Sequence, residues 1–392
     1  MLTPDSLPEF QKALADEGLD GWLLFDFRGV NPIAKELLRI EGMATRRQLA
    51  WIPASGTPIA FMHAIEQGPW SHWPKEWKRE LYSSWKSLEA LLARYVANRR
   101  VAMEYSPGDS VPYLDRIPAG VVEMVRAAGA DVVSSGELVS RFYAVWSEHD
   151  IESHQRAAEV IATIARDALA FAGRRAHAGH EITEHELMRW ILDQFQAHDV
   201  STDHGPNVSV GENAANPHYE PSAGHARPIR VGEILLIDLW AREQGGVYAD
   251  QTWIASVGAP SSEAKHMWSA VRDARDRAIA IVREASVRGT ALRGADVDDA
   301  ARSVIVERGY GSYFTHRTGH SIDSRDLHGS GPHLDNLETR EERLLIPGVG
   351  FSIEPGVYVP GKIGMRSEVN VFLRPGEAVV TPRVYQTELI EV

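Results

Sequence analysis

Two glutamates in the stretch FSIEPGVYVPGKIGMRSEV, residues 351–369, constrain the fold of this chain more than any other feature. Apolar and β-branched residues run up to Glu354 and to Glu368, and Pro360-Gly361-Lys362 between them is typical of a turn. In a β-hairpin centred on Gly361, the two carboxylates lie opposite each other on one face of the sheet. Like charges in this position destabilise a sheet unless a cation or a shared proton neutralises them. The pattern therefore predicts a hairpin with a neutralising group.

A second pair of acidic residues repeats this arrangement upstream. The apolar run 234–237 predicts a buried strand that ends at Asp238, and the run 246–249 predicts a return strand that ends at Asp250. A three-residue loop at 243–245 places the two aspartates opposite each other. Between the two hairpins, the segment around His320 adds an imidazole beside small residues.

Four carboxylates and one neutral imidazole carry a charge of about −4, which two divalent cations would cancel. This donor set contains oxygen and one nitrogen but no sulfur, so it suits manganese, cobalt, iron or zinc better than copper or a structural zinc finger. The sequence thus predicts a site for two divalent metal ions, with Mn²⁺ as first choice and Co²⁺ or Zn²⁺ as alternatives.

The five residues resemble, in order, the ligands of the pita-bread metallopeptidases, a family that includes methionine aminopeptidase, aminopeptidase P and prolidase. They are Asp238, Asp250, His320, Glu354 and Glu368, in the motifs LLIDLW, YADQTW, RTGHSI, SIEPGVY and MRSEV. The resemblance covers the chain from about residue 148 onward, and DGWLLFDFRGVNPIA is similar to the N-terminal domain of the creatinase and prolidase group. It implies an α/β N-terminal domain, residues 1–146, and an α+β pita-bread catalytic domain, residues 147–392.

The same resemblance assigns roles to further residues. His218, in VSVGENAANPHYEPS, matches a loop histidine that hydrogen-bonds the substrate or the reaction intermediate, and His328 matches a substrate-facing proton donor. His316 is expected on the substrate side or in the outer sphere of the metals, whereas His333 matches no role. Arg366 is expected at the substrate-binding site; it stands two residues before Glu368, on the same face of a strand, where a guanidinium can orient a carboxylate ligand.

The chain also departs from the family pattern. The two aspartates are twelve positions apart, and His328 follows His320 by eight positions, in each case one more than is usual. GHSID replaces GHGIG, and Gly329 follows His328 where the family has an acid. A bulge absorbs single insertions, so these departures affect the assignment of His328 more than the ligand set.

The resemblance implies hydrolysis of the Xaa-Pro bond, preferably in dipeptides, by a water that two metal ions acidify. Glu354 is expected to accept the proton of this water and pass it to the leaving nitrogen, while His218 and His328 stabilise the oxyanion or bind the substrate. Alternatives are an aminopeptidase P acting on longer peptides, a metal-dependent lyase, and a non-catalytic binding protein on the same scaffold. No G-x-S-x-G motif or P-loop points to a serine hydrolase or a nucleotide-binding protein.

Composition excludes several other classes of protein. The 392 residues are 44% hydrophobic and 24% charged, which is ordinary for globular domains, and the net charge of −13 opposes binding to nucleic acids or anionic membranes. No apolar stretch approaches the roughly 20 residues of a membrane span. The absence of cysteine fits a reducing compartment, so we expect a cytoplasmic protein, and the resemblance implies a homodimer.

Two local patterns predict helix starts. Ser147 with Asp150 is expected to cap a long helix over 151–174. HEITEHE, residues 180–186, fails the zinc-binding HExxH pattern by one position, and its Thr183 and Glu186 instead predict a capping box. The tryptophan-rich segment 67–85 either packs on its own domain or lines a substrate pocket across a dimer interface.

Overall fold

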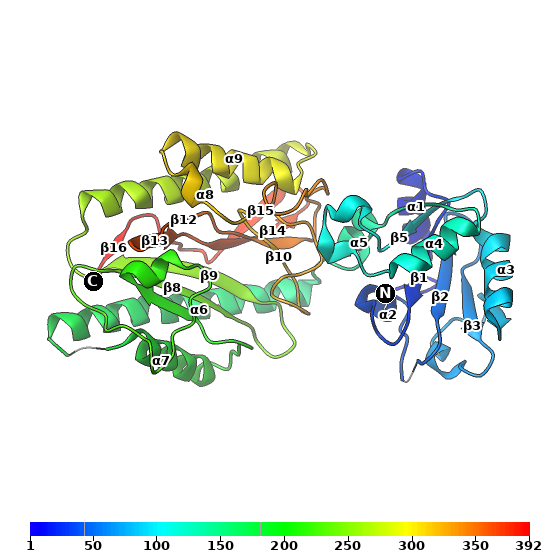
Figure 1. The fold of residues 1–392 in the computed structure, drawn as a ribbon, viewed down its shortest axis with the longest axis horizontal. Coiled ribbons are helices and arrows are strands. Elements are labelled where there is room, and N and C mark those ends of the chain that lie inside the picture. Colours follow the sequence, from blue (N-terminus) through cyan, green and yellow to red (C-terminus); the bar gives the residue numbers. More distant parts are fainter. Residues whose placement is uncertain (43, 181) are drawn as a thin grey trace. The chain divides into compact units, whose positions relative to one another are not determined.

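The computed structural model describes residues 1–392 except 43 and 181. Its contacts divide the chain into two compact units, residues 1–143 and 144–392, which are described separately (Figure 1). The sequence places this boundary between residues 146 and 147 instead. Trp146 accounts for the difference, because its Nε1 donates a hydrogen bond to the carbonyl oxygen of Ile322 at 2.8 Å, within the second unit.

The first unit contains a mixed sheet with the strand order β4-β3-β2-β1-β5-β6. Strands β1, β2 and β3 pair antiparallel, whereas β4, β5 and β6 join parallel to their neighbours. The elements are α1 (Leu7–Asp16), β1 (Gly21–Asp26), α2 (Pro32–Leu37), β2 (Gln48–Pro53), β3 (Ile59–His63), β4 (Lys78–Tyr82), α3 (Trp85–Val96), β5 (Arg100–Met103), α4 (Ala119–Ala127), β6 (Asp131–Ser134) and α5 (Gly136–Phe142).

The central strand β1 is buried on both faces of the sheet, and it is apolar at nearly every position. Trp22 and Leu24 pack toward α1, α2 and α5, while Leu23 and Phe25 pack toward α3 and α4. Three of the four tryptophans in the segment 67–85 are buried in the first of these cores, namely Trp70, Trp73 and Trp77, whereas Trp85 is 60% exposed. Packing on its own domain therefore accounts for most of the tryptophan-rich segment.

The second unit has long helices on two sides of paired sheets. Its elements are α6 (Glu148–His177), α7 (Glu184–Ala197), β7 (Asn207–Val210), β8 (Ile234–Ala241), β9 (Ala249–Ser256), α8 (Ser262–Arg288), α9 (Gly294–Glu307), β10 (Ser321–Ile322), β11 (Gly350–Ile353), β12 (Gly356–Val359), β13 (Ile363–Arg366), β14 (Val369–Arg374), β15 (Glu377–Thr381) and β16 (Ile390–Glu391). The strand orders are β16-β9-β8-β7 and β10-β11-β14-β15, and β12 pairs with β13.

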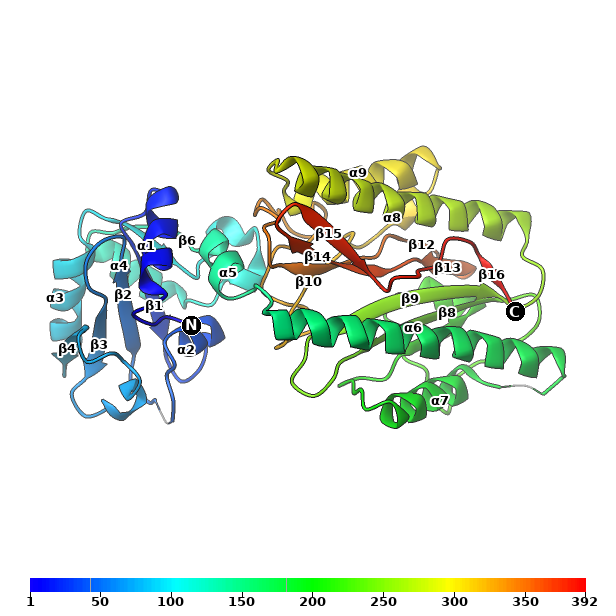
Figure 2. The same ribbon diagram turned by 180° about the vertical axis from the view of Figure 1, so that it is seen from behind.

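The helices of this unit cover opposite outer faces, as both views show (Figures 1 and 2). Leu235, Ile237 and Leu239 of β8 pack against α6 and α7, and Phe351 and Ile353 of β11 pack against α8. Because side chains alternate along a strand, the residues between those just named point to the opposite side, into the space between the sheets. This space receives Asp238 from β8 and Glu354, which follows β11.

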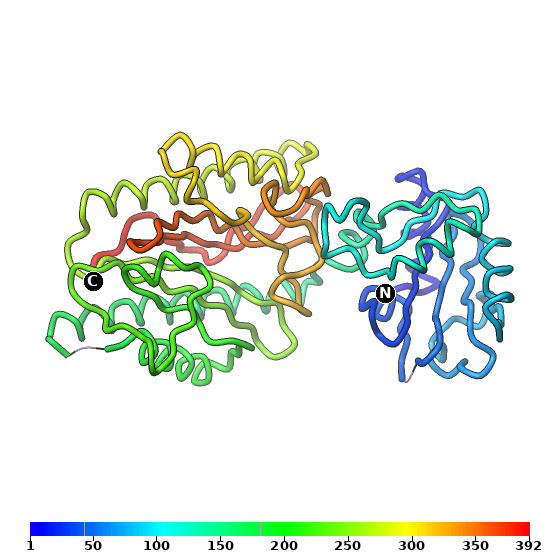
Figure 3. The backbone as a smooth tube through the Cα atoms, viewed as in Figure 1, coloured from blue at the N-terminus to red at the C-terminus, as the bar shows by residue number. Residues whose placement is uncertain are grey.

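The predicted helix starts in this unit are confirmed. Ser147 and Asp150 form a capping box at the start of α6, and Thr183 and Glu186 form one at the start of α7. The last strand, β16, lies parallel to β9, so the C-terminus ends beside the middle of the chain (Figure 3). Among the described residues, no helix is long and apolar enough to span a membrane.

Candidate metal centre

The hairpin of residues 350–374 has the predicted register. Ile353 pairs with Val369 on one side of the site and Gly356 with Arg366 on the other, so Glu354 and Glu368 lie opposite each other. The ladder breaks at this level because Pro355 has no N–H to donate. The N–H of Glu354 instead donates to the carbonyl oxygen of Thr318 at 2.7 Å, which ties the hairpin to the segment that carries His320.

The predicted register of the upstream hairpin is wrong by one pair. Asp238 pairs with Thr252, and Asp250 pairs with Trp240. The predicted return strand at 246–249 is also wrong, because β9 begins only at Ala249. The two aspartates still share a face, since the shift is an even number of residues.

Tertiary hydrogen bonds explain this longer loop. The backbone of Arg242 pairs with Ser201 at 2.9 and 3.0 Å, which draws Arg242 away from a tight hairpin. Val247 N–H donates to Ser153 Oγ at 3.3 Å, and the carbonyl oxygen of Tyr248 bonds the His154 ring at 2.7 Å, so both residues are held by α6. These partners lie far away in sequence and leave no local signal.

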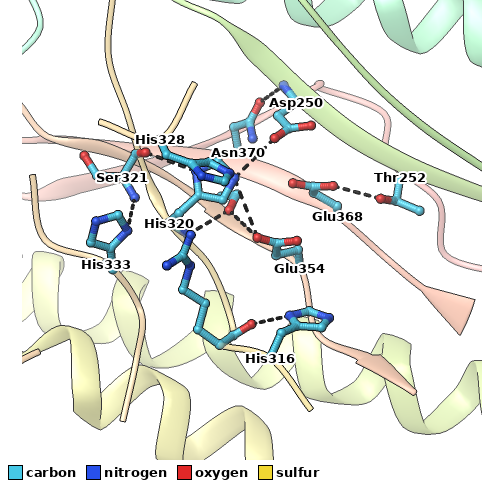
Figure 4. Close-up of polar contacts among 12 residues, drawn as sticks. Asp250, Thr252, His316, His320, Ser321, His328, His333, Glu354, Glu368 and Asn370 are labelled. Carbon is cyan, nitrogen blue, oxygen red and sulfur yellow. Dashed lines mark hydrogen bonds and ion pairs between the residues drawn. The ribbon is translucent and has the colours of Figure 1, made fainter. Parts of the chain in front are cut away.

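His320 belongs to neither hairpin, and its ring faces the carboxylates that the two hairpins carry (Figure 4). Its Nδ1 lies 3.0 Å from the carbonyl oxygen of Ser321, which as an acceptor fixes the proton on Nδ1. Its Nε2 therefore presents a lone pair, 3.3 Å from Asp250 Oδ2 and 3.6 Å from Glu354 Oε1. A metal-binding imidazole usually donates its other ring N–H to a carbonyl or carboxylate oxygen in this way.

Three of the predicted ligands converge tightly. Asp250, His320 and Glu368 each offer one atom, and these atoms lie within 4.8 Å of one another. Among the described residues, Asp250 Oδ1 and Glu368 Oε1 are buried without a hydrogen-bond partner. Buried carboxylate oxygens with no donor are costly, so this donor set fits a bound divalent cation.

The raised pKa values of the carboxylates also indicate a site for a bound cation. Burial, followed by the charge of Asp238, raises the pKa of Asp250 well above its usual range. Burial and the neighbouring Asp250 do the same to the pKa of Glu368. Burial raises the pKa of Glu354 to about 7, although Arg366 opposes this shift. A bound cation would relieve this repulsion between the carboxylates.

Arg366 connects Asp238 to the rest of the group. Its Nη2 forms an ion pair with Asp238 Oδ2, and its Nε donates to Thr252 Oγ1 at 2.7 Å. Thr252 Oγ1 in turn lies 2.8 Å from Glu368 Oε2. Thus Asp238 lies beside the cluster and is paired with arginine, and Arg366 contacts carboxylates directly, as its position on the strand predicted.

The predicted substrate-side histidines differ in their surroundings. The centre of the His328 ring is 4.2 Å from that of His320. His316 Nε2 lies 2.9 Å from the Tyr358 hydroxyl, and burial lowers its pKa to about 3. His218 is exposed.

Several residues of the site were not predicted from the sequence. Thr252 follows Asp250 by two positions, so strand periodicity alone would have placed it on the same face. Tyr358 lies within SIEPGVY, but only the folded chain brings its hydroxyl to His316. Asn370 Oδ1 accepts the N–H of Asp250 at 2.9 Å across the two sheets, and no local pattern indicates this contact.

A buried cluster of carboxylates around one imidazole, between two sheets, is a donor set that suits a divalent metal ion. The model of metallopeptidase family M24 matches residues 152–375, more than half of the chain. The chain therefore belongs to metallopeptidase family M24.

Individual relatives agree with this family. A probable dipeptidase PepE of Mycobacterium bovis is 29% identical over 274 residues, which cover 69% of this chain and 66% of that relative, slightly less than two thirds. The crystal structure of dipeptidase PepE from Mycobacterium ulcerans has a TM-score of 0.71 at 24% identity and covers 99% of this chain and 98% of that one. An Xaa-Pro dipeptidase from Bacillus anthracis has a TM-score of 0.63 at 21% identity, with full coverage of both chains. These similarities confirm the predicted pita-bread fold.

Proposed function

We propose that this protein is a metal-dependent dipeptidase that hydrolyses the bond before proline. The observation that carries the proposal is the convergence of Asp250, His320 and Glu368 within 4.8 Å, with buried carboxylate oxygens that have no hydrogen-bond donor in the described part of the chain. Membership of a metallopeptidase family supports it.

The five residues Asp238, Asp250, His320, Glu354 and Glu368 would hold two divalent metal ions. Their combined charge of about −4 is the charge that two such ions cancel, and the oxygen-rich donor set favours Mn²⁺, with Co²⁺ or Zn²⁺ as alternatives. When bound, such ions acidify a water and polarise a carbonyl group.

Glu354 is the proposed proton acceptor. Its Oε1 lies 3.2 Å from Ser352 Oγ, which holds the carboxylate in place, and 3.6 Å from His320 Nε2. It therefore stands at the ligand cluster, where it takes the proton of the attacking water and delivers it to the leaving nitrogen.

The histidines are proposed to handle the substrate. His328, whose ring lies beside that of His320, and His218 are both exposed, and each is proposed to donate a hydrogen bond to the substrate carbonyl or to the oxyanion. His316, whose ring is held by the Tyr358 hydroxyl, is proposed to line the substrate side of the site. Arg366 holds Asp238 in place through its ion pair and is proposed to contact the substrate from there.

The substrate class is proposed from the names of relatives and from the chemistry. A dipeptidase and an Xaa-Pro dipeptidase are among the proteins that resemble this chain. We therefore place Xaa-Pro dipeptides first. Longer Xaa-Pro peptides are the second candidate, because the same chemistry serves an aminopeptidase P. We further propose that the protein acts as a homodimer in the cytoplasm, which light scattering and cell fractionation would test.

The decisive experiment measures metal content and proline release together. Protein loaded with Mn²⁺, Co²⁺ or Zn²⁺ is incubated with Ala-Pro, Ala-Pro-Ala and Ala-Ala, and free amino acids are quantified. We expect cleavage of Ala-Pro, weak cleavage of Ala-Pro-Ala and no cleavage after Glu368→Gln. Preferred cleavage of Ala-Pro-Ala would replace the dipeptidase assignment. Metal-loaded protein that cleaves none of these peptides would contradict the proposal and favour a lyase or binding protein.

A further inference from the structure

We propose that Asp323 is the positioning residue for His328. Its buried carboxylate holds the loop 323–331 in the conformation that places the His328 ring against the His320 ring. The inference rests on the proposed function, in which His328 contacts the substrate, and it names what holds that histidine. Asp323 itself is not expected to touch the substrate.

The carboxylate of Asp323 is only 2% exposed and is bonded by the loop that it precedes. Its Oδ1 accepts the N–H groups of Arg325 at 2.8 Å and Asp326 at 2.9 Å, and its Oδ2 accepts the N–H of Ser330 at 3.4 Å. The N–H of Asp323 donates to the carbonyl oxygen of Asp326 at 3.2 Å. One buried side chain therefore contacts both ends of the loop.

Two glycines make room for this arrangement. A Cβ atom at Gly329 would lie 2.9 Å from Asp323 Oδ2 and 3.0 Å from Ser321 Oγ, and one at Gly331 would lie 2.6 Å from Ser321 Oγ. Ser321 Oγ also accepts the N–H of Gly331 at 3.0 Å. The Asp323 carboxylate thus fills the space that a side chain at position 329, next to His328, would occupy. Ser321, Asp323, Gly329 and Gly331 form one matched set.

The loop determines where the His328 ring lies. The His328 side chain is exposed, whereas its N–H donates to Asp326 Oδ1 at 3.1 Å, and Asp326 N–H is held by Asp323. The ring stands 4.2 Å from the His320 ring at an angle of 56°. Since an exposed side chain gains little from packing, its placement depends on the backbone that carries it.

A double-mutant cycle tests whether Asp323 acts through His328. Asp323→Ala, His328→Ala and the double variant are compared in kcat/KM for Ala-Pro hydrolysis. We expect Asp323→Ala to lower kcat/KM roughly 10- to 100-fold, as loss of a supporting hydrogen-bond partner usually does. In the His328→Ala background, the same change should cost less than about twofold. An equal loss in both backgrounds would overturn the proposal.

Conservative and matched variants separate positioning from stability. Asp323→Asn keeps an acceptor for the N–H groups of Arg325 and Asp326, so it should retain most activity. Asp335→Ala is the control: this carboxylate is also fully buried and accepts loop N–H groups at 2.9 Å, from Leu337 and Glu338. Its loss should cost the same whether residue 328 is histidine or alanine.

A measurement independent of activity distinguishes failure of this inference from failure of the proposed function. Histidine-selective NMR detects the contact between the rings of His320 and His328 directly. We expect Asp323→Ala to abolish this contact and Asp335→Ala to retain it, even if no peptide is cleaved. Gly329→Ala, which presses on the carboxylate, should reproduce the loss and replaces Asp323→Ala should the latter not fold. A contact that survives Asp323→Ala or Gly329→Ala would overturn the proposal.

Discussion

The Thr252 hydroxyl donates a hydrogen bond to Glu368 Oε2 at 2.8 Å, and so connects β9 of one sheet to the start of β14 in the other. The hydroxyl oxygen of Thr252 also accepts a hydrogen bond from Arg366 Nε at 2.7 Å. Thr252 therefore orients Glu368, a proposed metal ligand, and also holds the guanidinium of Arg366. Both are bonds between side chains, in addition to the backbone hydrogen bonds that pair the strands.

Thr252→Val tests this connection. Valine keeps the shape of threonine but leaves Glu368 Oε2 without its donor and Arg366 Nε without its acceptor. We expect Mn²⁺ affinity, measured by titration calorimetry, to fall roughly 10- to 100-fold, whereas Thr252→Ser should bind nearly as tightly as the native protein. Equal affinities for the valine and serine variants would show that the hydroxyl does not matter.

Arg366→Met should destabilise the metal-free protein more than the metal-loaded one. Removal of the guanidinium leaves Asp238 without its ion pair beside Glu354 and Glu368, and loss of one partner of a buried pair costs roughly 3–5 kcal/mol. Bound Mn²⁺ would replace that positive charge, so the loss should shrink by at least half in urea unfolding with Mn²⁺ instead of a chelator. Arg275→Met is the control, because Arg275 is also buried and also forms an ion pair, but with Asp276, which is not a proposed ligand; it further bonds Ser367 Oγ and the carbonyl oxygen of Gln386. Its cost should be the same with and without metal.

Gly319→Ala should abolish the metal site. A Cβ atom at this position would lie 2.0 Å from the carbonyl oxygen of Ser352, a backbone atom that cannot move without β11. We expect His320 to be displaced, with loss of measurable Mn²⁺ binding in calorimetry and a lower melting temperature. Gly224→Ala serves as a control, because nothing lies within 4 Å of its added Cβ. Mn²⁺ binding unchanged by Gly319→Ala would contradict this account of the close contact.

His154 should make stability depend on pH below neutrality. The ring is fully buried between the carbonyl oxygen of Tyr248 and Thr381 Oγ1, and burial lowers its pKa to about 4. In the unfolded chain its pKa is about 6.5, so the unfolded state binds the proton more tightly, and stability falls as pH decreases from about 6.5 to 4. The contribution is about 3 kcal/mol at most. The variant His154→Gln should lack this dependence on pH. In urea unfolding, the difference in unfolding free energy between native protein and variant should therefore shrink as the pH falls toward 4. A difference that stays constant with pH would contradict the assignment.

The sequence predicted features whose signals are local. The register of Glu354 and Glu368 follows from apolar alternation and a central Pro-Gly turn, and the structure has that register on both sides of the pair. The capping boxes at Ser147 and Thr183 follow from the spacing of three residues that a helix start requires. The upstream hairpin was predicted in the wrong register because α6 and Ser201 hold its loop, and those partners lie far away in the chain.

The order of the acidic residues and the histidine along the chain thus indicated by itself the family and the hairpin that carries Glu354 and Glu368. Only the tertiary structure decided that Thr252 faces Asp238, that Arg366 pairs with Asp238, and that the Asp323 carboxylate occupies the space beside Gly329. The physical reason is that strand alternation and turn chemistry act between neighbours in sequence. Contacts across two sheets depend instead on how the helices outside them bring distant segments together.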